Sequence, residues 1–321
     1  MGKTILRRLL VLMPQLVFVT ILVFILSEVM PGDPFMHLLE DSDISLNLAG
    51  LEQIHGLDLP FYERYFRWLG AIVTDWDFGV SIQHHRPVID IISERMGNTL
   101  RLSALTLFFT YLIAVPLGVI AGRNQGKVID KVILLYAFTA LAIPTVVLSI
   151  VVIYVFGFRG GWVPISGSVD VLLTTGTWSY YMSRLHHLIA PALTGAVLNM
   201  VGIIFFLRNE IVDVIGSEYV TTARSKGASK GDIYRRHVLR NALLPIAPSI
   251  GAIVSALFAG SIFIERVFSF PGIGTLFLTS IIQQDFSVVN TLVLMTSVLT
   301  AISVLFGDVL LMIIDPRISI R

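Results

Sequence analysis

Long apolar runs separated by polar segments make up most of the chain. Six of these runs have about 18 or more residues with few charges, the length that an α-helix needs to cross the hydrocarbon core of a bilayer. The pattern therefore predicts an all-α polytopic membrane protein with six transmembrane helices. The predicted spans are residues 9–29, 102–122, 132–158, 188–207, 242–264 and 287–314.

The longest predicted segment outside the spans covers residues 30–101 and carries many of the acidic side chains. Within it, residues 60–73 place aromatic and charged residues at helical spacing, and Pro60 suits the start of a helix. Two interpretations stay open: this helix lies on the membrane surface, or it forms a small external cap. Residues 275–284 are too few to cross a bilayer, so they predict a re-entrant or interfacial helix.

Small residues and prolines predict local features inside two spans. Gly118 and Gly122 lie four residues apart, which favours close packing against another helix. Pro144 lies within the third predicted span and should kink it. Packing is the commoner reason for such a kink, and gating is the alternative.

Composition and charge agree with a membrane protein and orient it. Of the 321 residues, 55% are hydrophobic and 14% are charged, against roughly 25% charged in soluble domains; the mean hydropathy is +0.81. Of the 23 Lys and Arg residues, 15 lie on the side that holds both termini. The positive-inside rule therefore predicts cytoplasmic termini, with a first span in 1–29, a core in 102–314 and a tail in 315–321.

Several kinds of chemistry are not expected of this chain. It contains no cysteine, so disulfides and thiolate metal sites are excluded. Gly2-Lys3-Thr4 lacks the upstream glycine of a phosphate-binding loop, so ATP should not bind here. The paired histidines lack spaced carboxylates, and no catalytic motif occurs, so we expect neither a metal site nor an enzyme. The basic residues are too few to indicate a nucleic-acid partner.

The polar segment in residues 208–241, between the fourth and fifth spans, is the most informative part of the sequence. It holds seven of the 23 basic residues and should face the cytoplasm. Gly227 suits the left-handed position that ends a helix. Ser229 and Asp232 form a capping-box pattern that opens a second helix at about Lys230. The charges alone could merely set orientation; the short capped helix favours docking to a partner.

The residue order in this segment resembles the cytoplasmic coupling loop of ABC-importer permeases, in particular the oligopeptide, dipeptide and nickel branch. Thr221-Thr222-Ala223 replaces the Glu-Ala-Ala of the general permease loop, a departure that is itself typical of this branch. The matching residues are Tyr219, Val220, Thr222, Ala223, Arg224, Lys226, Gly227, His237, Leu239, Arg240, Asn241, Ala242 and Pro245.

Shorter stretches that resemble the same branch occur in the expected order along the chain. Each is weak alone, but the order is hard to obtain by chance. They are the segments at residues 30–34 (MPGDP), 56–60 (GLDLP), 77–81 (DFGVS), 86–88 (RPV), 95–100 (RMGNTL) and 270–274 (FPGIG).

The resemblance implies one non-catalytic permease subunit of a binding-protein-dependent peptide importer in the cell membrane. Implied partners are a second related permease, two ABC ATPases that bind ATP and Mg²⁺, and an extracytoplasmic substrate-binding protein. The alternative is an ion-coupled transporter or channel, which the nearly charge-free spans argue against. The resemblance assigns ATPase coupling to Tyr219, Thr222, Ala223, Arg224, Lys226, Gly227, Ser229, Asp232, His237, Arg240 and Asn241.

Overall fold

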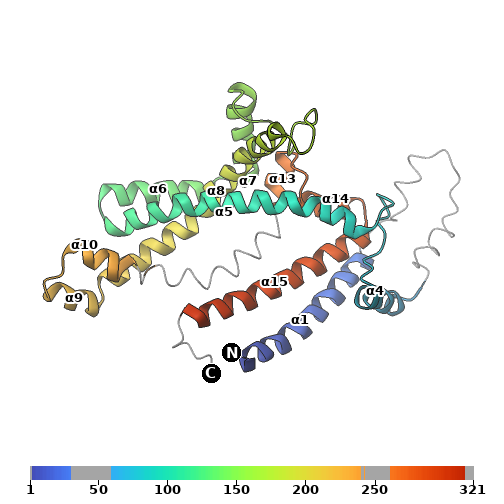
Figure 1. Ribbon diagram of the computed structural model, residues 1–321, viewed down its shortest axis with the longest axis horizontal. Coiled ribbons are helices and arrows are strands. Elements are labelled where there is room, and N and C mark those ends of the chain that lie inside the picture. Colours follow the sequence, from blue (N-terminus) through green and yellow to red (C-terminus); the bar gives the residue numbers. More distant parts are fainter. Residues whose placement is uncertain (1, 30–58, 240–241, 243–260, 315–321) are drawn as a thin grey trace.

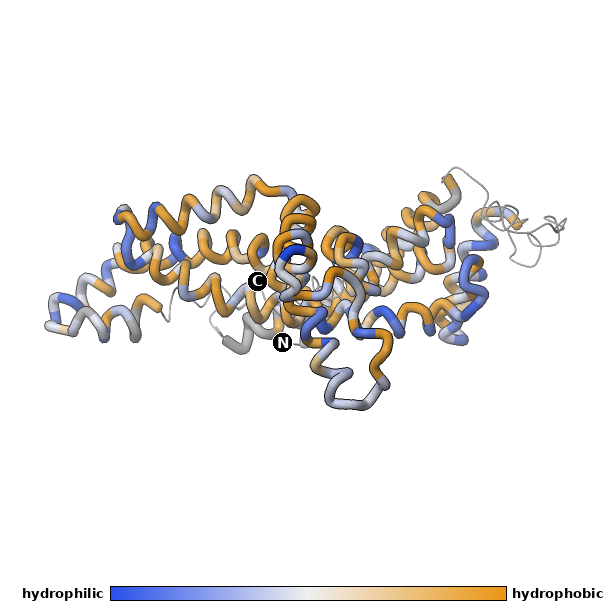
Figure 2. Tube along the Cα trace, turned by 90° about the horizontal axis from the view of Figure 1, so that it is seen from above, coloured by the Kyte–Doolittle hydropathy of each residue, from blue (hydrophilic) through white to orange (hydrophobic). Residues whose placement is uncertain are grey.

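The computed structural model describes residues 2–29, 59–239, 242 and 261–314. Over these ranges the chain is helical, apart from loops and one isolated antiparallel bridge between Val80 and Pro87. The long helices run along the long axis of the molecule (Figure 1). Hydrophobic residues dominate along them, and hydrophilic residues lie at the two opposite ends and in a loop that projects from the middle (Figure 2). The all-helical prediction is confirmed for the described residues.

Helices α5 (Val88–Arg123) and α8 (Trp178–Ile215) form the centre of the structure. The glycine prediction is confirmed, because a Cβ atom on Gly118 or on Gly122 would lie 2.8 Å from a side-chain carbon of α8. Without these glycines the two backbones could not approach as closely. Gly195 meets Thr106 about midway along both helices, and Gly118 and Gly122 meet Leu207 and Ile211 further along both, so α5 and α8 run parallel.

The third predicted span, residues 132–158, is not one kinked helix. Helix α6 (Val128–Ala142) ends before Pro144, and α7 (Thr145–Val152) starts after it and continues as a π-helical segment, η1 (Ile153–Arg159). The two arms are bent by 101°. Proline has no N–H to donate and pushes the preceding residue out of helical conformation, which converts the expected kink into a break.

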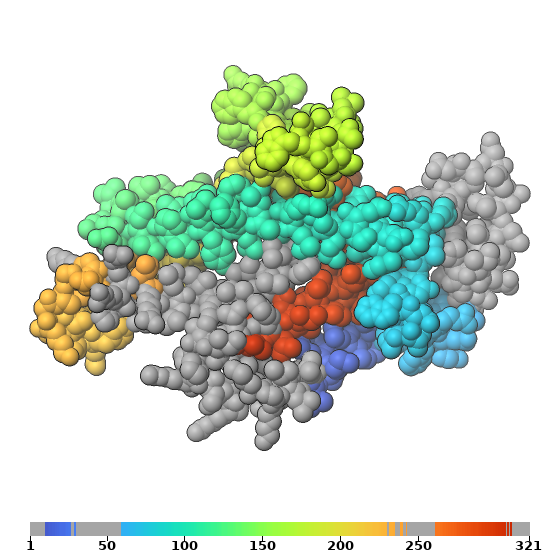
Figure 3. All heavy atoms as spheres, in the orientation of Figure 1, coloured from blue at the N-terminus to red at the C-terminus, as the bar shows by residue number. Residues whose placement is uncertain are grey.

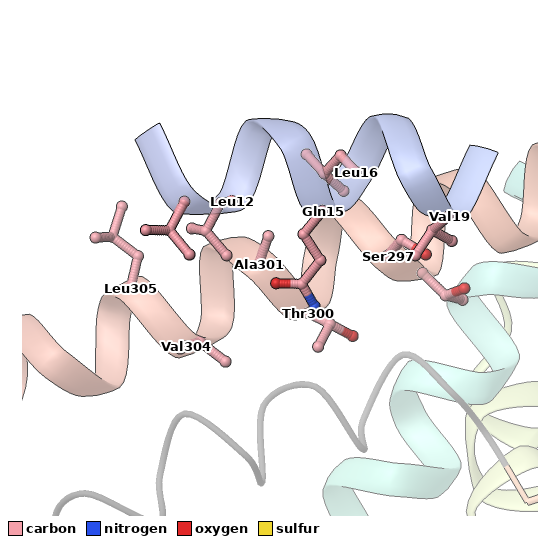
Figure 4. Close-up of a pocket in the computed structure, with 11 residues that line it drawn as sticks. Leu12, Gln15, Leu16, Val19, Ser297, Thr300, Ala301, Val304 and Leu305 are labelled. Carbon is pink, nitrogen blue, oxygen red and sulfur yellow. The ribbon is translucent and has the colours of Figure 1, made fainter. Parts of the chain in front are cut away.

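Helices α1 (Gly2–Val29) and α15 (Phe286–Ile314) pack antiparallel beside the centre (Figure 1). A cleft of 300 Å³ lies between them. Figure 4 shows Leu12 at about the level of Val304, and Val19 at about the level of Ser297. Pro14 lies within α1, in the part that lines this cleft.

Helix α4 (Phe61–Asp75) is the amphipathic helix that the sequence predicts after Pro60. Its buried side packs on the end of α1, where Tyr65 Oη lies 2.9 Å from Thr20 Oγ1. The ring of Phe24 contacts three aromatic rings of α4 at centroid distances of 5.4–5.7 Å. This helix is therefore anchored to α1, while Tyr62 and Phe66 stay exposed.

Helix lengths differ from the predicted spans where apolar residues beyond a span pack against other helices. Helix α5 begins at Val88, not at 102, because Val88, Ile91 and Ile92 pack against α14 and α15. By length and composition α5, α8 and the first 20 residues of α15 could each cross a membrane, and the bent α6–α7 pair would be a fourth candidate. Most of the predicted span 242–264 lies outside the described residues.

Two of the stretches that resemble the peptide branch meet at the end of the molecule opposite α9. Glu265 lies in α13 (Ile262–Val267) and is fully buried. Its carboxylate accepts hydrogen bonds from Thr99 Oγ1 (3.0 Å) and from the backbone N–H of Thr275 (2.9 Å) at the start of α14 (Ile273–Ile282). Asn98 Nδ2 donates to the carbonyl of Pro271 at 3.0 Å. These bonds join residues 95–100 to residues 270–274.

Candidate coupling site

The candidate site is the polar segment that follows α8. Helix α8 continues through Arg208 to Ile215, so the loop proper begins at Gly216 and not at the predicted residue 208. The hydroxyl of Ser217 donates to the carbonyl of Val214 at 2.6 Å, and helix α9 (Glu218–Ser225) starts directly afterwards. In Figure 3 this region projects at one end of the molecule.

Gly227 ends α9 as predicted. Its φ angle is +80°, a left-handed value that costs a residue with a Cβ atom about 1–2 kcal/mol. The N–H of Gly227 donates to the carbonyl of Arg224 (3.0 Å), and the N–H of Ala228 donates to the carbonyl of Ala223 (3.2 Å). This pair of bonds is the Schellman motif, which satisfies two of the last carbonyls of the helix.

Ser229 starts the second helix, also as predicted. Its Oγ accepts from the N–H of Asp232 at 3.1 Å and donates to Asp232 Oδ2 at 2.7 Å. The carboxylate therefore bonds the serine hydroxyl and not the serine N–H of a complete capping box. One turn of α-helix, α10 (Lys230–Asp232), passes into a π-helical segment, η2 (Ile233–Val238).

An apolar underside fixes this helix pair to the long helices. Val220 from α9 and Ile233 and Val238 from η2 are buried in one cluster with Ile211 from α8, and Val119 from α5 packs against it. Buried apolar area of this kind contributes about 25 cal/mol per Å². The position of the helix pair is therefore coupled to the ends of α5 and α8.

Tyr234 makes the most specific contacts between the loop and α5. Its hydroxyl donates to the carbonyl of Val119 at 3.4 Å, and the guanidinium of Arg123 lies 5.3 Å from its ring centroid. Burial raises the pKa of the Tyr234 phenol, so it keeps the proton that this hydrogen bond needs. The sequence pattern did not single out Tyr234, although an aromatic residue in an otherwise polar and basic helix was an available signal.

An ion pair ties α6 to α8 near the same end. Arg208 Nε and Nη2 donate to the two oxygens of Asp130 at 2.7 and 2.8 Å. The side chain of Asp130 is 2% exposed, and it also accepts from the N–H of Gly126 at 2.8 Å. Arg208 therefore belongs to the helix framework, although the sequence pattern grouped it with the basic loop.

The structure places the predicted coupling residues on two sides of the loop. Thr222, Arg224 and Lys226 are exposed, as is Tyr219, whereas Ala223 is half-buried against the apolar underside. His237 lies in η2, and its side chain, together with Arg240 and Asn241, lies outside the described residues. In the described part of the chain, no group of three or more His, Asp or Glu side chains could hold a metal ion.

Fold and site together define a helical membrane component with an exposed helix pair beyond its central helices. Two family models match the chain: the binding-protein-dependent transport system inner membrane component at residues 114–320, and the N-terminal part of such membrane components at residues 1–103. The chain therefore belongs to the family of binding-protein-dependent transport system inner membrane components.

Similar proteins cover the chain from end to end. The oligopeptide transport system permease protein AppB of Bacillus subtilis (strain 168) is 36% identical over 99% of this chain and 100% of its own length. The dipeptide transport system permease protein DppB of Lactococcus lactis is 30% identical, and the glutathione transport system permease protein GsiC of Escherichia coli (strain K12) is 31% identical, each over all of both chains.

A solved structure shares the fold. A chain of the MetNI methionine ABC transporter in an inward-facing conformation aligns with a TM-score of 0.54 and 17% identity, over 71% of this chain and 97% of that chain. At this identity the likeness concerns the fold alone.

Proposed function

We propose that this chain is one of two permease subunits of an ATP-driven importer for peptides. The family is that of binding-protein-dependent transport components, and relatives matched over their whole length are named for oligopeptide, dipeptide and glutathione transport. The chain itself is a non-catalytic permease. A second, related permease would complete the translocation pathway, and an extracytoplasmic binding protein would deliver the peptide.

The observation that carries the coupling proposal is the helix pair α9–α10, in which Gly227 caps the end of α9 and Ser229 caps the start of α10. Its polar side is exposed, with Arg224 and Lys226 available to a partner, and its apolar side is anchored to α5 and α8. A surface built in this way suits docking into a groove of an ATPase subunit. ATP and Mg²⁺ would bind to that subunit and not to this chain. ATPase closure would then move the loop and, through it, the ends of both helices.

The proposed topology has six spans in the inner or plasma membrane, with both termini in the cytoplasm. The start of α1 and the end of α15 lie toward the same end of the molecule (Figure 1). The parallel course of α5 and α8 requires an intervening return through α6 and α7, as six alternating spans would have. Lys and Arg are concentrated on the side that holds α9, which supports its cytoplasmic placement.

The test is a gentle-detergent pull-down of the tagged chain with two variants at one position. We expect wild type to bring down two ATPases and a second permease. Gly227→Val should lose or loosen the ATPases and abolish uptake, because a β-branched residue strains φ +80° and misdirects the second helix. Gly227→Asn is the matched control: asparagine tolerates the left-handed region, and no atom lies within 4 Å of the added Cβ.

Two outcomes would contradict the proposal. Normal ATPase binding and uptake by Gly227→Val would remove the coupling role from this loop. A wild-type chain that purifies alone, with uptake that survives depletion of ATP, would favour the ion-coupled transporter or channel instead.

A further inference from the structure

A basic pocket opens at the end of the molecule opposite the coupling loop. It has a volume of 570 Å³, within the range of about 300–1,000 Å³ that small-molecule sites occupy. Three elements each contribute one cationic or titratable side chain: His84 from the loop before α5, Arg95 from α5 and Arg266 from α13. The remaining wall combines the turn 269–271 with α14.

The acidic side chains near this pocket already have other partners. Glu94 pairs with Arg86 at 2.6 Å, and Asp285 accepts from the hydroxyl of Ser81. The fully buried Glu265 and the exposed Glu94 both lie within electrostatic range of Arg95, but the hydrogen bonds of Glu265 go to Thr99 and Thr275. Among the described residues neither Arg95 nor Arg266 forms an ion pair, so both guanidinium groups are available to a ligand.

The chemistry of the wall indicates what kind of ligand fits. Two arginines offer planar forks of N–H donors, which match the two oxygens of a carboxylate. Thr275 and Thr279 add hydroxyl groups, and Phe270 and Leu276 add apolar surface. A concave pocket of this size accommodates a short chain end better than the broad surface of another protein.

We infer that this pocket binds the C-terminal carboxylate of the incoming peptide at the outer side of the membrane. The inference rests on the proposed function. A transporter that accepts peptides of varied sequence can rely only on groups that all peptides share, and the terminal carboxylate is the anionic one. Arg95 and Arg266 hold this carboxylate, while the apolar wall receives side chains without selecting among them.

The first experiment measures binding directly on the purified importer complex. Phenylglyoxal modification of Arg95 and Arg266 is followed by mass spectrometry, with tri-alanine, tri-alanine amide or no peptide. Tri-alanine should protect both arginines and the amide should not, while Arg159, an exposed arginine at the end of η1, reacts equally in all three samples. Equal reactivity of Arg95 and Arg266 with and without tri-alanine would overturn the inference, whatever the complex transports.

The second experiment measures uptake of tri-alanine into proteoliposomes. Arg266→Gln should raise KM about tenfold, the effect of losing one charged hydrogen-bonding partner, and should leave kcat nearly unchanged. Arg159→Gln, the matched control, should change neither constant. Protection of the arginines without any uptake would support this pocket and contradict the proposed importer.

One further outcome identifies a different occupant. If the binding protein protects Arg95 and Arg266 without peptide, and tri-alanine alone does not, the two arginines hold an acidic surface of that protein. That result would overturn the peptide site.

Discussion

At the scale of single residues, three buried carboxylates hold together parts of the chain that are far apart in sequence. Asp130 joins α6 to α8, Glu265 joins α13 to α5 and α14, and Asp285 accepts from the hydroxyl of Ser81 in the loop before α5. Each carboxylate has hydrogen-bond donors around it, which offset the cost of removing a charge from water. These residues act as fixed joints between helices.

The joint at Glu265 depends on Gly272. A Cβ atom at position 272 would lie 2.4 Å from the carboxylate carbon of Glu265, so Gly272→Ala must displace a bonded, buried group. We expect a loss of about 1–3 kcal/mol, as in other overpacked sites, measured as a lower unfolding temperature in detergent. Gly70→Ala in α4 is the control: its Cβ meets no atom within 4 Å, so that variant should be neutral or slightly stabilised.

The joint at Asp130 depends on both hydrogen bonds from the Arg208 guanidinium, one from Nε and one from Nη2. Arg208→Gln leaves a carboxylate that is 2% exposed without its charged partner, which should cost about 3–5 kcal/mol. Arg208→Lys keeps the charge but loses the bidentate geometry, so its loss should be smaller. Thermal unfolding of the two variants tests this order. The double variant Asp130→Asn, Arg208→Gln should recover part of the loss; no recovery would show that Arg208 acts through other contacts.

At the scale of elements, the parallel pair α5–α8 forms the most extensive helix contact among the described residues. The contact extends from Gly195 beside Thr106 to Gly122 beside Ile211. Because small residues let the two backbones approach, van der Waals contact accumulates along the whole interface. The rest of the described helices are arranged around this pair.

Gly122→Leu should therefore weaken the pair. Its Cβ alone would lie 2.8 Å from two carbons of Ile211, and the larger side chain would force the helices apart. We expect a lower yield of folded protein and an unfolding temperature several degrees below wild type, since each kcal/mol corresponds to about 2–4 °C in domains of 150–250 residues. The matched control is Gly202→Leu, on the exposed side of α8, where no atom lies within 4 Å.

At the scale of the whole molecule, Tyr234 connects the exposed loop to α5, which leads to the basic pocket at the other end. Arg95 of that pocket and Arg123 beside Tyr234 belong to the same helix. A movement of α9 and α10 would therefore reach the opposite end of the molecule through one continuous helix. Coupling in this sense is a difference in contact energy between two states of the transporter.

Tyr234→Ala should uncouple ATP hydrolysis from uptake. The variant loses the hydrogen bond to Val119 and the ring beneath Arg123, but it leaves the exposed side of α9 intact for the ATPase. We expect ATPase activity to persist while peptide uptake per ATP falls about tenfold. Coupling free energies between two sites are roughly 1–3 kcal/mol, and losing one of that size gives an effect of this order. Tyr234→Phe keeps the ring and should lose little. Parallel losses of both activities in Tyr234→Ala would indicate a docking defect instead.

Short-range features of the chain follow from the sequence because they depend on neighbouring residues. The left-handed glycine at 227, the cap at Ser229 and the helix after Pro60 involve contacts within a few residues. The break at Pro144 was predicted as a kink, since the sequence places the proline but not the bend of 101°. The joints at Asp130 and Glu265 and the contacts of Tyr234 could not be predicted, because their partners lie 78, 166 and 115 residues away.

The sequence by itself determined the class of protein, the all-helical architecture and the position of the polar loop that contains α9 and α10. Hydrophobic run length and local caps act over one or two helical turns, and they leave a direct trace in residue order. Only the tertiary structure decided that α5 begins at Val88, that Arg208 pairs with Asp130, and that Arg95 and Arg266 share one pocket. These features depend on which helices meet, and that is set by packing between residues distant in the chain.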